Sequence, residues 1–85
     1  MGSKEEAIEF FDRSIEINPT AAAFKTKGDC LWDSKKLTEA LELYDKAIFL
    51  NENYFIAYWG RGSILVSLER YNEAKESFEK VKYFF

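Results

Sequence analysis

Few side chains in this sequence could perform chemistry. Its 85 residues include no histidine and one cysteine, Cys30. These two residue types supply most metal ligands, nucleophiles and general bases in proteins. Because no histidine could act as its base, we interpret Cys30 as a small residue at a helix-packing surface. We expect no catalytic, cofactor-binding or metal-binding residue.

Two carboxylates, Glu39 and Glu73, are the remaining candidates for acid–base catalysis. They lie 34 residues apart, and each directly precedes an alanine, Ala40 or Ala74. Recurrence beside a small residue indicates a structural role within a repeated element. The sequence therefore favours a protein that is not an enzyme.

The composition narrows the class of partner. Twelve basic and fifteen acidic residues give a net charge of −3, which argues against a nucleic-acid partner. No apolar run approaches the roughly 18 residues of a membrane span. One cysteine cannot form an internal disulfide, so we expect a reducing, cytoplasmic setting. We interpret residues 1–3 as a remnant of cloning.

The elements that position these side chains follow from an internal repeat. At an offset of 34 residues, Gly28 corresponds to Gly62, Leu31 to Leu65, Ala40 to Ala74 and Tyr44 to Phe78. A partial copy lies upstream at an offset of 33, where Ala7, Phe11 and Ile15 correspond to Ala40, Tyr44 and Ile48. Each full copy holds two segments with helical periodicity.

The periodicity predicts five helices, at about 4–17, 21–34, 38–51, 55–68 and 72–84. Short polar connections predict antiparallel neighbours, and Pro19 ends the first helix. We expect three units: the second helix of a truncated repeat at 4–19, a full repeat at 21–53, and a full repeat at 54–85 without a capping helix.

Gly28 and Gly62 fall inside predicted helices, where glycine costs about 1 kcal/mol relative to alanine. We therefore expect each glycine to admit a close neighbouring backbone, at Ala40 and Ala74 respectively. The aromatic residues of the repeat would fill the core beside that contact.

These residues resemble the tetratricopeptide repeat over essentially the whole chain after residue 3. The positions that carry the resemblance are Gly28, Ala40, Tyr44, Gly62, Ala74, Phe78 and Pro19. The resemblance implies an all-α fold, a right-handed α-solenoid of antiparallel helix pairs with an unpaired N-terminal helix. Lys27 and Arg61 replace the family's leucine before glycine, and we expect their stems to lie along apolar surface.

The resemblance also implies protein–protein interaction through a concave groove that is lined by the first helix of each unit. The matching positions are Ala22, Lys25, Thr26, Asp29, Trp32, Asp33, Ile56, Trp59, Gly60, Ser63, Val66 and Ser67. Trp32 and Trp59 are the sharpest candidates, because tryptophan is enriched among residues that dominate binding energy. The alternative is that each is half-buried against a neighbouring helix.

One subfamily grips the terminal carboxylate of chaperone tails with basic and asparagine side chains. Only Lys25 matches a position of that clamp, and Asp29 stands where asparagine would be needed. Thr26 and Gly60 replace other polar contacts. Because an aspartate would repel a carboxylate, we do not expect a chaperone tail as partner.

Both ends of the predicted array leave apolar side chains uncovered. They are Ile8, Phe11 and Ile15 at one end and Tyr83, Phe84 and Phe85 at the other. Soluble monomers rarely expose such patches, so we expect a homo-oligomer, a dimer formed by stacking or helix exchange. The leading prediction is a scaffold that binds a protein or peptide in the groove. The alternative is a self-associating structural spacer.

Overall fold

The structure, a computed structural model, describes residues 3–83 of the chain and the side chains of residues 5–82. Five α-helices occupy this part: α1 (Ser3–Ile17), α2 (Ala21–Asp33), α3 (Leu37–Leu50), α4 (Phe55–Ser67) and α5 (Tyr71–Tyr83). Each helix end lies within one residue of its prediction, and residues 3–83 contain no strand. The prediction of an all-α fold with five helices is confirmed.

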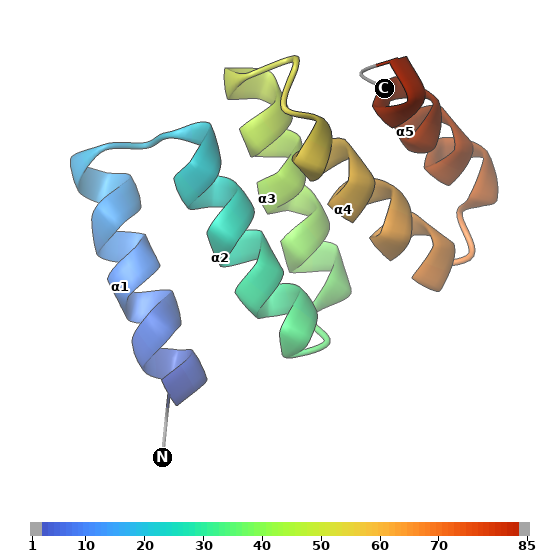
Figure 1. Cartoon of the computed structure of the whole chain (residues 1–85). Coiled ribbons are helices and arrows are strands. Elements are labelled where there is room, and N and C mark those ends of the chain that lie inside the picture. Colours follow the sequence, from blue (N-terminus) through green and yellow to red (C-terminus); the bar gives the residue numbers. More distant parts are fainter. Residues whose placement is uncertain (1–2, 84–85) are drawn as a thin grey trace.

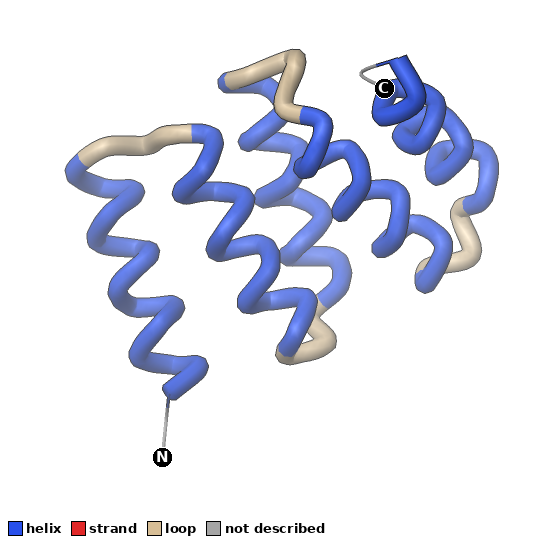
Figure 2. Tube along the Cα trace, viewed as in Figure 1, coloured by secondary structure: helices blue, strands red, loops and turns tan. Residues whose placement is uncertain are grey.

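The helices stand in one row in chain order, and each is antiparallel to the next (Figure 1). Short loops join them alternately at the two edges of the row (Figure 2). α1 contacts only α2, and α5 contacts only α4, whereas α2 also reaches α4. The row therefore has two free ends, one at α1 and one at α5.

Left-handed residues end the first helix of each pair. Lys35 and Glu69 have φ angles of 63° and 60°. The amides of the residues that follow, Lys36 and Arg70, donate to carbonyls five residues earlier at 2.8 Å. This pattern is a Schellman cap, a position that ordinarily favours glycine. The two turns therefore repeat at the 34-residue offset in conformation as well as in length.

The core lies between α2, α3, α4 and the inner face of α5, and α1 covers it only loosely. Its most deeply buried side chains are Ala40, Tyr44, Ala47, Ala57, Ile64 and Leu65. Among residues 5–17 of α1, no side chain is fully buried. α1 is therefore the helix with the smallest share in the core among those of residues 5–82.

The glycines admit aromatic rings, which corrects the expected glycine–alanine contacts. A Cβ atom on Gly62 would have three carbons of the Phe78 ring as its nearest neighbours, the closest at 2.8 Å. A Cβ atom on Gly28 would lie 3.3 Å from the Tyr44 ring and 3.5 Å from the carbonyl oxygen of Ala40. The contact with Ala40 is thus through the backbone, and in both units the ring comes closest.

Gly60 was expected in the groove, but it is buried against the same tyrosine. A Cβ atom there would meet the Tyr44 ring at 2.8 Å. The ring of Tyr44 therefore enters between Gly28 of α2 and Gly60 of α4. Two glycines and one ring thus fix the spacing between successive units, because a flat ring needs bare backbone on either side.

Lys27 and Arg61 each form an ion pair with the preceding helix. Lys27 Nζ lies 2.5 Å from Asp12 Oδ1, which joins α2 to α1. Arg61 Nε lies 2.7 Å from Asp45 Oδ1, which joins α4 to α3. Arg61 also donates to Ser77 Oγ at 2.7 Å. Each unit is therefore tied to the preceding helix by an ion pair at an equivalent position.

Candidate functional site

A hollow of about 530 Å³ opens where the end of α2 lies beside α4. Its lining, which we call the tryptophan hollow, consists of Asp29, Trp32, Asp33, Lys35 and Trp59. Four of these five were predicted groove residues. The structure thus brings together predicted residues that lie up to 30 positions apart in the sequence.

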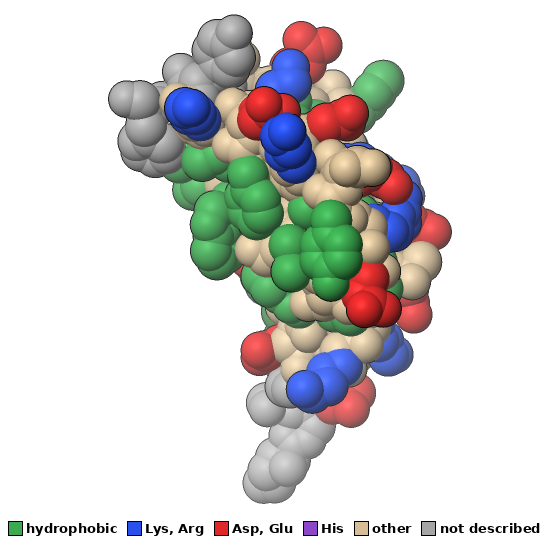
Figure 3. All heavy atoms as spheres, turned by 90° about the vertical axis from the view of Figure 1, so that its right-hand side faces the viewer, with side chains coloured by type: hydrophobic (Ala, Val, Ile, Leu, Met, Phe, Trp, Pro, Cys, Tyr) green, Lys and Arg blue, Asp and Glu red, His purple; other side chains and the backbone are tan. Residues whose placement is uncertain are grey.

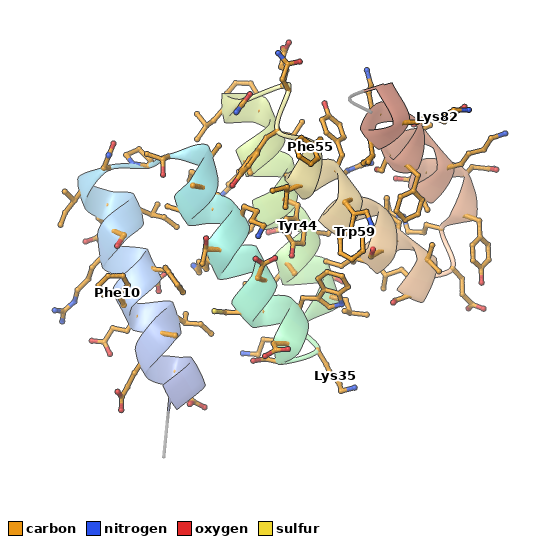
Figure 4. All side chains as sticks on the ribbon, in the orientation of Figure 1. Phe10, Lys35, Tyr44, Phe55, Trp59 and Lys82 are labelled. Atoms are coloured by element: carbon orange, nitrogen blue, oxygen red, sulfur yellow. The ribbon has the colours of Figure 1, made fainter. Side chains whose placement is uncertain are left out.

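The two tryptophans have different environments. Their ring centroids are 6.1 Å apart, with the planes tilted by 52°. Trp32 is half-buried and meets the Tyr44 ring edge-on at 6.4 Å. Trp59 is 53% exposed and stands on α4 (Figure 4). The alternative that a tryptophan is half-buried against a neighbouring helix therefore holds for Trp32. Trp59, by contrast, exposes about half of its surface to solvent.

The charge of Asp29 is balanced by neighbours. Lys25 Nζ lies 2.7 Å from Asp29 Oδ2, one helical turn away. The Tyr44 hydroxyl donates a hydrogen bond to Asp29 Oδ1. Burial, together with this hydrogen bond, raises the pKa of Tyr44 above its ordinary value of 10.0. Tyr44 therefore stays protonated and able to donate at neutral pH.

A second, apolar hollow continues the surface toward the start of α4. It measures about 390 Å³ and is lined by Phe55, Ile56, Trp59 and Val81. Trp59 lines both hollows, so they meet at its ring. Ile56 and Trp59 were predicted here. Together the two hollows form a groove with one exposed indole at its centre.

Other predicted groove residues serve the helices or face elsewhere. Ala22, Lys25, Thr26 and Ser63 line neither hollow. The hydroxyls of Thr26 and Ser63 donate to carbonyl oxygens one turn earlier, at 2.7 and 3.0 Å. Val66 lines a different hollow, between α4 and α5. Of the predicted groove residues, those that line the two hollows are Asp29, Trp32, Asp33, Ile56 and Trp59.

Sequence reasoning missed Lys35, Phe55 and Val81. Lys35 belongs to a turn, and the left-handed φ that places it on the rim has no signature in a non-glycine residue. Val81 lies in the second helix of its unit, whereas the family resemblance confines the groove to first helices. Phe55 directly precedes Ile56, and that adjacency was the one available signal.

The uncovered residues at the N-terminal end differ from those expected. Ile8, Phe11 and Ile15 are half-buried. Phe10 and Ile17, by contrast, are 65% and 85% exposed. The side chain of Tyr83 and the whole of Phe84 and Phe85 lie outside the described part of the chain. Of the expected remnant at residues 1–3, residues 1 and 2 lie outside it too, whereas Ser3 begins α1.

Within residues 3–83, no helix combines the length and the apolar character needed to cross a bilayer. Within the same range, no three acidic, cysteine or histidine side chains gather in a way that could hold a metal ion.

The sequence matches one protein family and several of its members. A family profile described as TPR repeat matches residues 28–68, and one described as tetratricopeptide repeat matches residues 1–20 and 56–83. RNA polymerase II-associated protein 3 of Xenopus tropicalis is 36% identical over 81 residues, 94% of this chain and 12% of that protein. TPR repeat-containing protein MJ1428 of Methanocaldococcus jannaschii is 31% identical over 77 residues, 91% of this chain and 14% of that protein. The chain thus spans a small part of these relatives.

Solved structures share the fold. The second TPR of Spaghetti (RPAP3), bound to the HSP90 peptide SRMEEVD, has a TM-score of 0.91 and 31% identity, covering 96% of this chain and 77% of that chain. The first TPR of Spaghetti, bound to the same peptide, has a TM-score of 0.90 and 27% identity, covering 94% and 64%. The crystal structure of MamA has a TM-score of 0.87 and 26% identity, covering 94% and 47%.

The expectation that a chaperone tail is excluded as partner is wrong, because both Spaghetti domains hold an HSP90 peptide on this fold. That expectation treated Asp29 as an unbalanced charge, whereas Lys25 and Tyr44 both engage it.

The family profiles match the same stretches of the chain that fold into the stacked helices. With a tetratricopeptide profile matching more than half of its residues, the chain belongs to the tetratricopeptide repeat family.

Proposed function

We propose that the chain is a non-catalytic interaction module that binds a peptide or a segment of a partner protein across α2 and α4. The observation that carries this proposal is the exposed ring of Trp59 between two adjoining hollows. Each hollow falls in the size range of protein ligand pockets, roughly 300–1,000 Å³. An indole that is covered on binding is a common source of binding energy.

An acidic tail of the HSP90 type is the first ligand to test. The peptide SRMEEVD combines two apolar residues with three acidic ones, and the groove pairs apolar walls with Lys35 on its rim. Lys25 neutralises Asp29 beside the groove, which removes the repulsion that a bare aspartate would exert. We expect the methionine or valine of the peptide to cover Trp59.

Intrinsic fluorescence provides a direct assay. Trp32 and Trp59 are the two tryptophans of the chain, and both line the tryptophan hollow. The peptide contains no aromatic residue, so a change in emission on titration reports the hollow alone. Calorimetry with Trp59→Ala should show a loss of affinity of about 30-fold, the effect of a residue worth roughly 2 kcal/mol.

Phe49→Ala is the matched control. Phe49 is an aromatic residue that is 85% exposed on α3, and it lines neither hollow. This variant should bind as the unmodified chain does. Equal affinities for the two variants would contradict a groove centred on Trp59. No binding of SRMEEVD to the unmodified chain would remove acidic tails from the proposed ligand class.

Self-association as a structural spacer is a second candidate function. Exposed apolar residues at both free ends of the row favour it: Phe10 and Ile17 on α1, and Val66 and Tyr71 at the other end. Sedimentation equilibrium tests it. An average mass that stays at 10.0 kDa over all concentrations would contradict it.

A further inference from the structure

The free end of the row at α4 and α5 carries a shallow hollow of about 420 Å³. Its apolar lining is Val66, Tyr71, Ala74 and Phe78. Viewed from this end of the row, hydrophobic side chains gather in a cluster with lysine, arginine and acidic side chains around it (Figure 3). Tyr71 is 60% exposed there. This surface is therefore open and apolar.

One repeat earlier in the chain, a helix covers the equivalent surface. At the 34-residue offset, Val66 and Phe78 correspond to Trp32 and Tyr44. Trp32 and Tyr44 both contact α4, through Trp59 and Gly60 respectively. The hollow at the free end thus has the form of a surface that, in this same molecule, packs against a helix.

The opposite end of the row offers a helix with an uncovered face. α1 contacts only α2, whereas α2 and α4 each have a neighbour on both sides. Phe10 and Ile17 are exposed on α1 and lie seven residues apart, which places them on one face of the helix. A second copy of the chain can therefore present α1 without unpacking any helix.

Charged residues on the two faces match in order and in spacing. The α4–α5 hollow is lined by Lys75, Glu79 and Lys82, at positions i, i+4 and i+7. α1 carries Glu9, Arg13 and Glu16, exposed at the same spacing with the opposite signs. At about 100° per residue, the charges of α5 lie to one side of Phe78 and those of α1 to the other side of Phe10. Packing α1 parallel to α5 brings the opposite charges together. The docked α1 then runs opposite to the direction that α4 takes over α3 at the equivalent surface one repeat earlier.

We infer that a second copy of the chain docks its α1 on the α4–α5 hollow of the first, with Phe10 in the hollow and Arg13 opposite Glu79. The inference rests on self-association, the second function proposed above, and specifies its geometry. Such a contact joins two different surfaces, so each pair keeps one free face at either end. Assembly is therefore open-ended, head to tail, and weakened by salt.

A charge-reversal experiment on the full chain tests this geometry. Arg13→Glu and Glu79→Lys each place like charges at the contact, and each should weaken self-association by about tenfold in sedimentation equilibrium. An equimolar mixture of the two variants should restore it, and so should the double variant. Both residues are exposed, so circular dichroism should show an unchanged fold. Glu52→Lys, the same charge change in the loop before α4, is the control and should associate as the unmodified chain does.

The outcomes separate the inference from the function on which it rests. A mass of 10.0 kDa at every concentration for the unmodified chain would overturn self-association itself. Association that continues unchanged in Arg13→Glu, or that the double variant does not restore, would leave self-association standing and overturn the head-to-tail contact. A discrete dimer that does not grow with concentration would also overturn it, because a symmetric contact closes.

Discussion

Replacing Gly60 with alanine tests how tightly the units are spaced. The added Cβ would meet the Tyr44 ring at 2.8 Å. That ring has no room to move, because it is fully buried, hydrogen-bonded to Asp29, and packed edge-on against Trp32. Overpacking of this kind costs about 1–3 kcal/mol, against a gain of about 1 kcal/mol for alanine over glycine within a helix. We expect a net loss of up to about 2 kcal/mol.

Gly62→Ala is the matched control, with the same close distance and the opposite expected outcome. A Cβ there would meet the Phe78 ring, also at 2.8 Å. Phe78, however, is half-buried and lines the open hollow at the end of the row, so its ring can shift outward. The helix-propensity gain then prevails, and we expect a change between zero and about 1 kcal/mol in favour of the variant.

Urea denaturation followed by circular dichroism measures both variants. With a slope of about 1 kcal/mol per M for a small domain, the midpoint of Gly60→Ala should lie roughly 1–2 M below that of Gly62→Ala. If Gly60→Ala were as stable as Gly62→Ala, the sealed position of Tyr44 would be wrong. The Tyr44 ring would then not fix the spacing between successive units.

Two further predictions concern stability. Lys35→Gly and Glu69→Gly should each stabilise the fold by about 1 kcal/mol, because glycine adopts the left-handed conformation of these caps without strain; an unchanged urea midpoint would contradict this. The stability linked to Tyr44 should be fully present below pH 10 and fall above it, since its pKa is raised in the folded chain and the deprotonated form favours unfolding. Urea midpoints between pH 9 and 11 should therefore decline less in Tyr44→Phe than in the unmodified chain.

Most of the fold could be predicted from the sequence, because its apolar and small residues recur at two spacings. They recur at each helical turn within a segment and again 34 residues further along the chain. Pro19 and the polar turns then fixed the helix ends. The role of the glycines could not be predicted as well. Gly60 corresponds to Thr26 at the 34-residue offset, so no recurrence marked it. Its burial depends on the Tyr44 ring, which comes from another helix.

The site was harder to predict, because it depends on how charges pair in space. Asp29 was judged as a single residue that would repel a carboxylate. Its i, i+4 spacing from Lys25 was visible in the sequence and could have indicated an ion pair. The donation from Tyr44 was not visible, because it crosses from α3 to α2. Trp59 could be predicted as a groove residue, but its greater exposure relative to Trp32 follows from packing.

The most direct test of the central claim is the pair of tryptophan indole signals in a proton–nitrogen NMR spectrum of the chain titrated with SRMEEVD. Both indoles belong to the tryptophan hollow, and no others exist in the chain. Binding in the groove predicts that the Trp59 signal shifts most, the Trp32 signal shifts less, and both saturate together. Indole signals that stay in place while backbone signals of α5 move would contradict the groove as the binding site.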